Sequence, residues 1–215
     1  MRVLNRKSNH EPARASRPMS ASASGFVPGS GAGVLVLETL QSARERGVRI
    51  YAEILGGAVN CGGQRMGGSM TAPNPHGVQA CIRAAMHDSG IEAHQIDAIN
   101  GHLTATFADP HEIRNWAVAL QREADDFPWI NSSKSLFGHA LGAAGGLEAV
   151  ACVLQVYHQF VHGSANCEDL HPELTAYANR IVRETLDTEI NIQAKASFGF
   201  GDVNACLIFK RWVEA

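Results

Sequence analysis

WINSSKSLFGHALGAAGGLEAV, residues 129–150, combines the signals of a short buried strand, a turn and a helix. Trp129 and Ile130 suit the end of a buried strand, three polar residues then favour a turn, and an Ala- and Leu-rich stretch favours a helix. Lys134 and His139 are therefore predicted to lie in a strand-to-helix connection. A histidine just before a helix start stays neutral and can donate a ring N–H to a substrate carbonyl. The alternative is that Lys134 is solvated and His139 is only a hydrogen-bonded packing residue.

Glycines are frequent around this stretch and near the beginning of the chain. Gly138, Gly142, Gly145 and Gly146 bracket or enter the predicted helix, where each glycine costs roughly 1 kcal/mol relative to alanine. We therefore expect a ligand or another helix to approach the backbone there. The glycines of residues 29–33 are followed by a strand-like sequence, not by the helix that a phosphate loop requires, so they predict a tight backbone crossing.

A second motif, NGHLTAT at residues 100–106, follows the short apolar run of residues 96–99. The run predicts a strand, which places His102 just beyond the carboxyl end of that strand. Open α/β sheets bind ligands at this edge. His102, Lys134 and His139 are therefore predicted to form one site.

Four motifs occur in a defined order along the chain: GFVPGSGAG at residues 25–33, HLTAT at 102–106, KSLFGH at 134–139 and GFGDVN at 199–204. Together they resemble the G-F-V-x-G-x-G-A-G, H-G-T-x-T, K-x-x-x-G-H and G-F-G-G-T-N motifs of the β-ketoacyl-acyl carrier protein synthases, the condensing enzymes of the thiolase-like superfamily. The resemblance covers nearly the whole chain.

The resemblance implies an α/β, thiolase-like fold, in which this chain holds the C-terminal half, a mixed β-sheet flanked by helices. Residues 1–24 are expected to be a polar N-terminal segment. Residues 25–215 are expected to be the C-terminal ketosynthase domain, including the last strand of the first half at about residues 26–38.

Periodicity and capping residues predict the individual elements. Helices are expected over residues 38–46, 75–89, from 109 onwards, and 141–159. Strands are expected over residues 34–37, 50–58, 96–99, 129–130, 190–196 and 205–209.

Composition excludes several classes of function. The chain has 215 residues, 45% hydrophobic content and a formal net charge of -3, without a lysine-rich face, so nucleic acid is not an expected partner. No apolar run approaches the ~20 residues of a membrane span. Five cysteines without C-x-x-C spacing argue against a disulfide framework and a zinc ribbon, and a cytoplasmic location fits best.

Two other candidate sites are weak. Cys61 lies in a glycine-rich stretch without a helix start or a neighbouring cation, so a loop cysteine is favoured over a nucleophile. His158 and His162 have i,i+4 spacing but no third ligand, so partly solvated histidines at a helix end are favoured over a metal site. We expect no metal.

The resemblance also implies roles for individual residues. The catalytic residues would be His102, His139 and Lys134. Supporting residues would be Glu112, Phe200 and Asn204, and substrate-binding residues would be Thr104, Thr106 and Phe198.

Several of these roles are specific. Glu112 would form an ion pair with Lys134, although a first-turn glutamate stabilised only by the helix dipole is the alternative. Phe200 would be a gate over the nucleophile, and the two threonines would bind the pantetheine arm of the carrier. Leu103 replaces a glycine of the family and Asp202-Val203 replaces Gly-Thr, so both changes are expected to crowd the site.

The resemblance implies a decarboxylative Claisen condensation of an acyl thioester with malonyl-acyl carrier protein, in fatty acid or polyketide synthesis. His102 and His139 would form the oxyanion hole. The D-x-A-C-x-S motif that carries the acylated cysteine in the family is not found in the sequence. A missing first half would supply this cysteine, and the chain alone would be inactive and would expose an apolar face.

The expected partners are an acyl carrier protein, whose phosphopantetheine carries the substrates, and a cysteine-bearing half or subunit. No cofactor is expected, and the complete enzyme is expected to be a dimer. Three alternatives stay open: a catalytically silent, chain-length-factor-like subunit, a non-functional fragment, and a thiolase-like hydrolase or acyltransferase that uses a cysteine of this chain.

Overall fold

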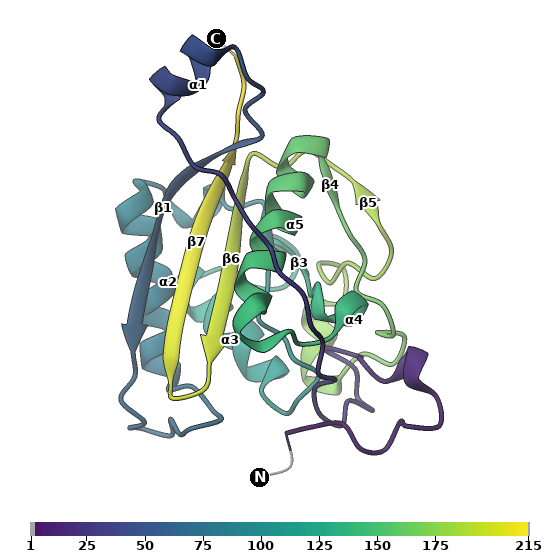
Figure 1. Cartoon of the computed structure of the whole chain (residues 1–215). Coiled ribbons are helices and arrows are strands. Elements are labelled where there is room, and N and C mark those ends of the chain that lie inside the picture. The colour runs from purple at the N-terminus through teal and green to yellow at the C-terminus, as the bar shows by residue number, and fades with distance from the viewer. Residues whose placement is uncertain (1–2, 215) are drawn as a thin grey trace.

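A five-stranded mixed sheet forms the centre of the computed structural model, which describes residues 3–214 (Figure 1). Its order is β1 (Ala52–Cys61), β7 (Val203–Arg211), β6 (Ile192–Gly199), β2 (Ala98–Asn100) and β3 (Trp129–Asn131). The pairs β1–β7 and β7–β6 are antiparallel, whereas β6–β2 and β2–β3 are parallel. The carboxyl ends of β6, β2 and β3 therefore lie at one edge of the sheet.

Helices cover both faces of the sheet. In Figure 1, α2 (Pro75–Ser89) and α3 (Asp109–Leu120) lie behind the sheet and α5 (Ala144–His158) lies in front of it. Two shorter helices are α1 (Leu40–Arg46) and α4 (Lys134–Phe137). The strands β4 (Phe160–Val161) and β5 (Leu186–Asp187) pair in a separate small sheet. Short 3-10 turns occupy Pro12–Arg14, Ala93–Gln95, Ala124–Asp126, Leu141–Ala143 and Pro172–Tyr177.

Local signals explain why α2 has the predicted bounds. The side chain of Asn74 accepts hydrogen bonds from the backbone N–H groups of His76 and Gly77 and so caps the first turn. Gly90 ends the helix in the left-handed region at a φ of 64°. The prediction of a helix over residues 75–89 is confirmed, as is the helix start at Asp109.

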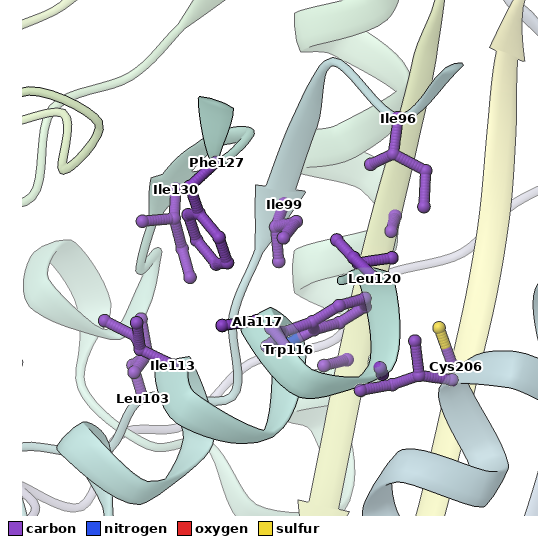
Figure 2. Close-up of a cluster of buried hydrophobic side chains, with 14 of the residues drawn as sticks. Ile96, Ile99, Leu103, Ile113, Trp116, Ala117, Leu120, Phe127, Ile130 and Cys206 are labelled. Carbon is purple, nitrogen blue, oxygen red and sulfur yellow. The ribbon is translucent and has the colours of Figure 1, made fainter. Parts of the chain in front are cut away.

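The main hydrophobic core lies between the sheet and the pair α2 and α3. Figure 2 shows Trp116 and Ile113 of α3 among side chains of the strands, including Ile99, Ile130 and Cys206. A smaller core lies under α5 and includes Cys152 and Phe209. Within residues 3–214, no helix is both long and apolar enough to cross a membrane.

The segment that precedes α1 differs from the prediction. Residues 29–39 have no regular secondary structure, so the strand expected at 34–37, and with it the regular strand expected at about 26–38, is wrong for this structure. Val34, Val36 and Leu37 are 78%, 86% and 69% exposed, because no strand among the described residues pairs with them. The sequence predicted exposed apolar side chains for a chain that lacks the first half of the fold, and these residues are of that kind.

The same segment confirms the predicted backbone crossing. A Cβ atom added to Gly33 would lie 2.2 Å from the carbonyl carbon of Gly146, and one added to Gly29 would lie 2.2 Å from the carbonyl oxygen of Phe137. In Figure 1 this segment crosses the face that α5 covers. Gly138 and Gly146 are therefore explained by an adjacent stretch of chain, whereas Gly142 and Gly145 line the cavity described below.

Smaller differences concern element ends. Strand β1 extends to Cys61, three residues past the predicted end, so Cys61 terminates a strand and does not lie in a free loop. The helix predicted over residues 141–159 begins with a 3-10 turn and becomes α-helical at Ala144. Residues 1–2 of the predicted polar segment and residue 215 of the predicted domain lie outside the described residues.

Candidate active site

Three loops at the carboxyl edge of the parallel strands converge on one cavity of about 470 Å³. His102 follows β2, His139 follows α4, and Phe200 follows β6, and all three line the cavity. The ring centroids of His102 and His139 are 5.3 Å apart, with an angle of 85° between the ring planes. The predicted convergence of the two histidines is therefore present in the structure.

His139 has a defined neutral tautomer. The backbone N–H of Leu141 donates to Nδ1 of His139 over 3.2 Å, so this nitrogen carries no proton and Nε2 carries the ring N–H. Burial, followed by the charge of Lys134, lowers the pKa of His139 to about 4. The ring also packs edge-on against Phe26, with centroids 5.0 Å apart. At neutral pH, His139 is thus an oriented N–H donor.

His102 is neutral for similar reasons. Burial is the main cause that lowers its pKa well below the usual range, and Lys134, His139 and Lys195 lower it further. Its Nδ1 atom is buried and has no hydrogen-bond partner among the described residues. Both imidazoles therefore combine burial with nearby positive charge, which together disfavour the imidazolium form.

Glu112 holds the loop that carries His102. Its two carboxylate oxygens accept hydrogen bonds from the backbone N–H groups of His102 and Leu103, at 2.6 and 2.7 Å. Burial raises the pKa of Glu112 to about 7 despite these two hydrogen bonds. The side chain thus orients the backbone of the loop and does not reach into an ion pair with Lys134.

The predicted ion pair of Lys134 with Glu112 is wrong. The Nζ atom of Lys134 instead contacts Oε1 of Glu148 on α5, and the Nζ atom of Lys195 lies 3.2 Å from Oε2 of the same carboxylate. All three side chains are almost completely buried. Glu148 and Lys195 were not predicted as site residues, although each is the single Asp, Glu, Lys or Arg of its helix or strand, which is a usable signal.

A family assignment follows from the chain's similarity to known proteins. Residues 51–168 match the family model described as beta-ketoacyl synthase, C-terminal domain. This match covers more than half of the chain. The chain belongs to the β-ketoacyl synthase family.

Individual relatives within the β-ketoacyl synthase family agree with this assignment. The chain is 40% identical over 204 residues to the chloroplastic 3-oxoacyl-[acyl-carrier-protein] synthase I of Arabidopsis thaliana, covering 94% of this chain and 41% of that enzyme. It is 37% identical over 211 residues to 3-oxoacyl-[acyl-carrier-protein] synthase 1 of Escherichia coli K12, covering 98% of this chain and 49% of that enzyme. The chain therefore spans about two fifths to half of these relatives.

A solved structure supports the fold assignment. It contains a type II polyketide acyl-carrier protein in complex with its ketosynthase bound to the hexaketide. The match has a TM-score of 0.88 and 28% identity, and covers 99% of this chain and 51% of that chain. The chain thus has the architecture of half of a ketosynthase, and the predicted thiolase-like α/β fold is confirmed.

The other predicted site residues of this β-ketoacyl synthase domain are distributed around the cavity. Thr104 and Thr106 line it, and their Oγ1 atoms are 3.0 Å apart. Phe200 is 50% exposed at the cavity, with its ring centroid 6.4 Å from that of Phe26. Phe198 lines the cavity but is mostly buried in the core beside Trp116.

Two changes relative to the family motifs were predicted to crowd the site, but Leu103, Asp202 and Val203 are not among the described residues that line the cavity. Leu103 is fully buried in the main core, Asp202 is buried under the loop of residues 62–74, and Val203 is half-exposed. The Asp202 carboxylate accepts hydrogen bonds from the backbone N–H groups of Asn74 and Gln64, at 2.7 and 2.9 Å. Asn204 supports the same region, since its Nδ2 atom donates to Oδ1 of Asn60 over 3.0 Å.

His158, His162 and Cys61 are not among the described residues that line the cavity. Nε2 of His162 is 2.9 Å from Oγ of Ser133, and the described residues contain no cluster of three or more His, Cys, Asp or Glu that could hold a metal ion. Cys61 is exposed, with Sγ 3.7 Å from the carbonyl oxygen of Gly201. Among the described residues that line the cavity there is no cysteine.

Proposed function

We propose that the chain is the C-terminal part of a β-ketoacyl-acyl carrier protein synthase, an acyltransferase of the 3-oxoacyl synthase type. The reaction is a decarboxylative Claisen condensation of an acyl thioester with malonyl-acyl carrier protein, in fatty acid or polyketide synthesis. The observation that carries the proposal is the pair of neutral imidazoles in one cavity. The chain is 40% identical to a plant 3-oxoacyl-[acyl-carrier-protein] synthase over most of its length, which supports the same reaction class.

The proposed roles follow from the charge that develops in the reaction. When the carbon–carbon bond to the malonyl carboxylate breaks and carbon dioxide leaves, its electron pair moves into the thioester and produces an enolate oxygen. His139 Nε2–H and a ring N–H of His102 donate hydrogen bonds to this oxygen. The enolate carbon then attacks the acyl group on a cysteine, and the cysteine thiolate leaves.

Lys134, Phe200 and the two threonines have secondary roles in this proposal. Lys134 disfavours protonation of both imidazoles through its charge. Thr104 and Thr106 present two hydroxyl groups at the cavity wall, which suits hydrogen bonding to the pantetheine arm. Phe200 is half-exposed at the cavity and gates the acyl-cysteine, while Phe198 contacts substrate.

The reaction needs partners. A cysteine-bearing N-terminal half or subunit supplies the nucleophile, and an acyl carrier protein presents both substrates on its phosphopantetheine, so no separate cofactor is required. The complete enzyme is proposed to be a dimer that acts in the cytoplasm. The exposed apolar side chains of residues 34–37 support contact with another half or subunit.

The test is to mix the chain with a cysteine-bearing partner of the same family and to assay malonyl decarboxylation and chain extension. Activity is expected only in the mixture, and His139→Ala in the mixture is expected to lose about 10²- to 10³-fold in decarboxylation rate. His158→Ala, outside the cavity, is the matched control and is expected to retain the rate. Activity of the chain alone, or full activity of His139→Ala, contradicts the proposal. A mixture that binds but stays inactive favours a catalytically silent subunit.

A further inference from the structure

Lys195 is a buried amine that the proposed mechanism does not use. It lies in β6 between Ala194 and Ala196 and is 3% exposed. Its Nζ atom is 3.2 Å from Oε2 of Glu148 and donates a hydrogen bond to Oγ of Ser197. A buried ammonium is costly unless it is paired, so its retention beside the candidate site calls for a physical explanation.

Lys195 adds a second lysine contact to Glu148. Lys134 and Lys195 contact opposite oxygens of the single Glu148 carboxylate. Two lysine side chains therefore share one carboxylate. Burial lowers the pKa of Lys134, Glu148 raises it, and Lys195 lowers it further.

The Lys195 amine lies close to the cavity. Gly145 and Ser197 both line the cavity, and a Cβ atom added to Gly145 would lie 3.7 Å from Nζ of Lys195 and 3.9 Å from Oγ of Ser197. This amine thus lies close to two residues of the cavity wall. The field of a charge in such a poorly solvated site is weakly screened.

We propose that Lys195 is a positioning residue for the oxyanion hole: it lies against the Glu148 oxygen that Lys134 does not contact, and its charge acts at the cavity that His102 lines. This proposal rests on the proposed function for its catalytic meaning, but its electrostatic content concerns the chain alone. The same charge favours the anionic transition state of decarboxylation.

Several titratable groups sense Lys195, from helices, strands and loops packed around it. They are Lys134 on α4, Glu148 and Cys152 on α5, Cys206 on β7, and His102 after β2. Burial of the two cysteines raises the pKa of each thiol, so they remain neutral at pH 7. For His139, burial and Lys134 lower the pKa and Glu148 raises it, without a contribution from Lys195.

This asymmetry gives an internal control. Removing the charge of Lys195 should raise the pKa of His102 and leave that of His139 close to its original value. A general loosening of the site would instead change the pKa values of both histidines together.

The experiment is a pH titration of the histidine ring signals by NMR on the isolated chain. Lys195→Met is expected to move the titration midpoint of His102 upwards, and Lys195→Arg, which keeps the charge, is expected to leave it near the wild-type value. Lys210→Met removes an exposed amine on β7 and is the matched control, expected to have no effect. An unchanged His102 midpoint in Lys195→Met, or equal shifts of His102 and His139, overturns the proposal.

A measurement on the wild-type chain keeps the proposal testable if Lys195→Met does not fold. The chain has four lysines, Lys7, Lys134, Lys195 and Lys210, so their side-chain nitrogen signals can be assigned individually. The Lys195 signal is expected to show through-space contacts with Glu148 and Ser197, and a signal without these contacts overturns the proposal.

The catalytic consequence is measured separately, in the mixture with a cysteine-bearing partner. Lys195→Met is expected to lower kcat for decarboxylation by about tenfold with KM unchanged, less than the loss of a direct donor. Lys195→Arg is expected to restore most of kcat. If wild-type mixtures are inactive while the His102 midpoint shifts as expected, the proposed function fails and the electrostatic role of Lys195 stands. A rise in KM with kcat unchanged contradicts the positioning role.

Discussion

The two faces of the five-stranded sheet differ in what they bury, and strand β6 shows the difference within three residues. Ala194 and Ala196 belong to the apolar core between the sheet and the pair α2 and α3. Lys195, between them, contacts Glu148 on α5. Because successive side chains of a strand point to opposite faces, one strand contributes to an apolar core and to a charged cluster. The face under α2 and α3 carries the main apolar core, whereas the face under α5 carries a smaller apolar core together with the buried ion cluster of Lys134, Glu148 and Lys195.

The largest expected effect concerns the apolar face. Trp116→Ala removes a fully buried indole from the main core and is expected to lower the free energy of unfolding by about 3–5 kcal/mol (Figure 2). Urea denaturation followed by circular dichroism measures this change. Val118→Ala, at a 43% exposed position of the same helix, is the control and is expected to cost far less. Equal costs for the two variants would mean that the two positions do not differ in packing.

A pH-dependent effect tests Glu112, which joins α3 to the loop of His102. Its pKa is raised to about 7 in the folded chain from a usual value of 4.5, so the folded state binds this proton more tightly than the unfolded state. Its contribution is therefore present below pH 4.5 and is lost as the pH rises to 7, by up to about 3 kcal/mol.

Glu112→Gln is expected to remove this dependence. The measurement is the difference in unfolding free energy between wild type and variant, taken by urea denaturation at several pH values. The variant should gain relative to wild type between pH 4.5 and 7. A difference that stays constant with pH would show that the pKa of Glu112 is not raised. His102 and His139 contribute an opposite pH dependence of stability. Because wild type and variant both retain these histidines, their contribution cancels in the difference.

A smaller effect is expected in the loop that follows β2. Ala105 has a φ of 62°, in the left-handed region that alanine adopts at a cost of roughly 1–2 kcal/mol. Ala105→Gly is therefore expected to raise the free energy of unfolding by about 1 kcal/mol, measured by thermal or urea denaturation. Ala85→Gly, inside α2, is the matched control and should destabilise the chain instead. Loss of stability in Ala105→Gly would contradict the strain.

The smallest effect on stability is expected on the exposed segment across the α5 face. Val36→Ser replaces an 86% exposed apolar side chain and is expected to change the free energy of unfolding by less than about 0.5 kcal/mol. The same variant should reduce self-association, measured by sedimentation velocity, because exposed apolar side chains favour contact with another surface. Thr175→Ser, at an exposed position far along the chain, is the control. Unchanged association would show that Val36 is not part of a contact surface.

The sequence determined those features that depend on a few neighbouring residues. Asn74 and Gly90 set the ends of α2, Asp109 and Pro110 set the start of α3, and the runs before His102 and Lys134 predicted the strands that bring both loops to one edge. Capping, turn chemistry and periodicity act over one or two turns of chain, so they can be recognised without tertiary contacts.

Tertiary structure decided which partner each buried charge takes. Glu112 and Glu148 both lie within about 25 residues of Lys134 in the sequence. In the structure, however, Glu112 accepts hydrogen bonds from backbone N–H groups, whereas Glu148 contacts both Lys134 and Lys195. It also decided that residues 34–37 form no strand, because a strand needs a neighbour for its backbone N–H and C=O groups. Ion pairing and strand pairing depend on which elements cross in space, and sequence spacing does not encode that geometry.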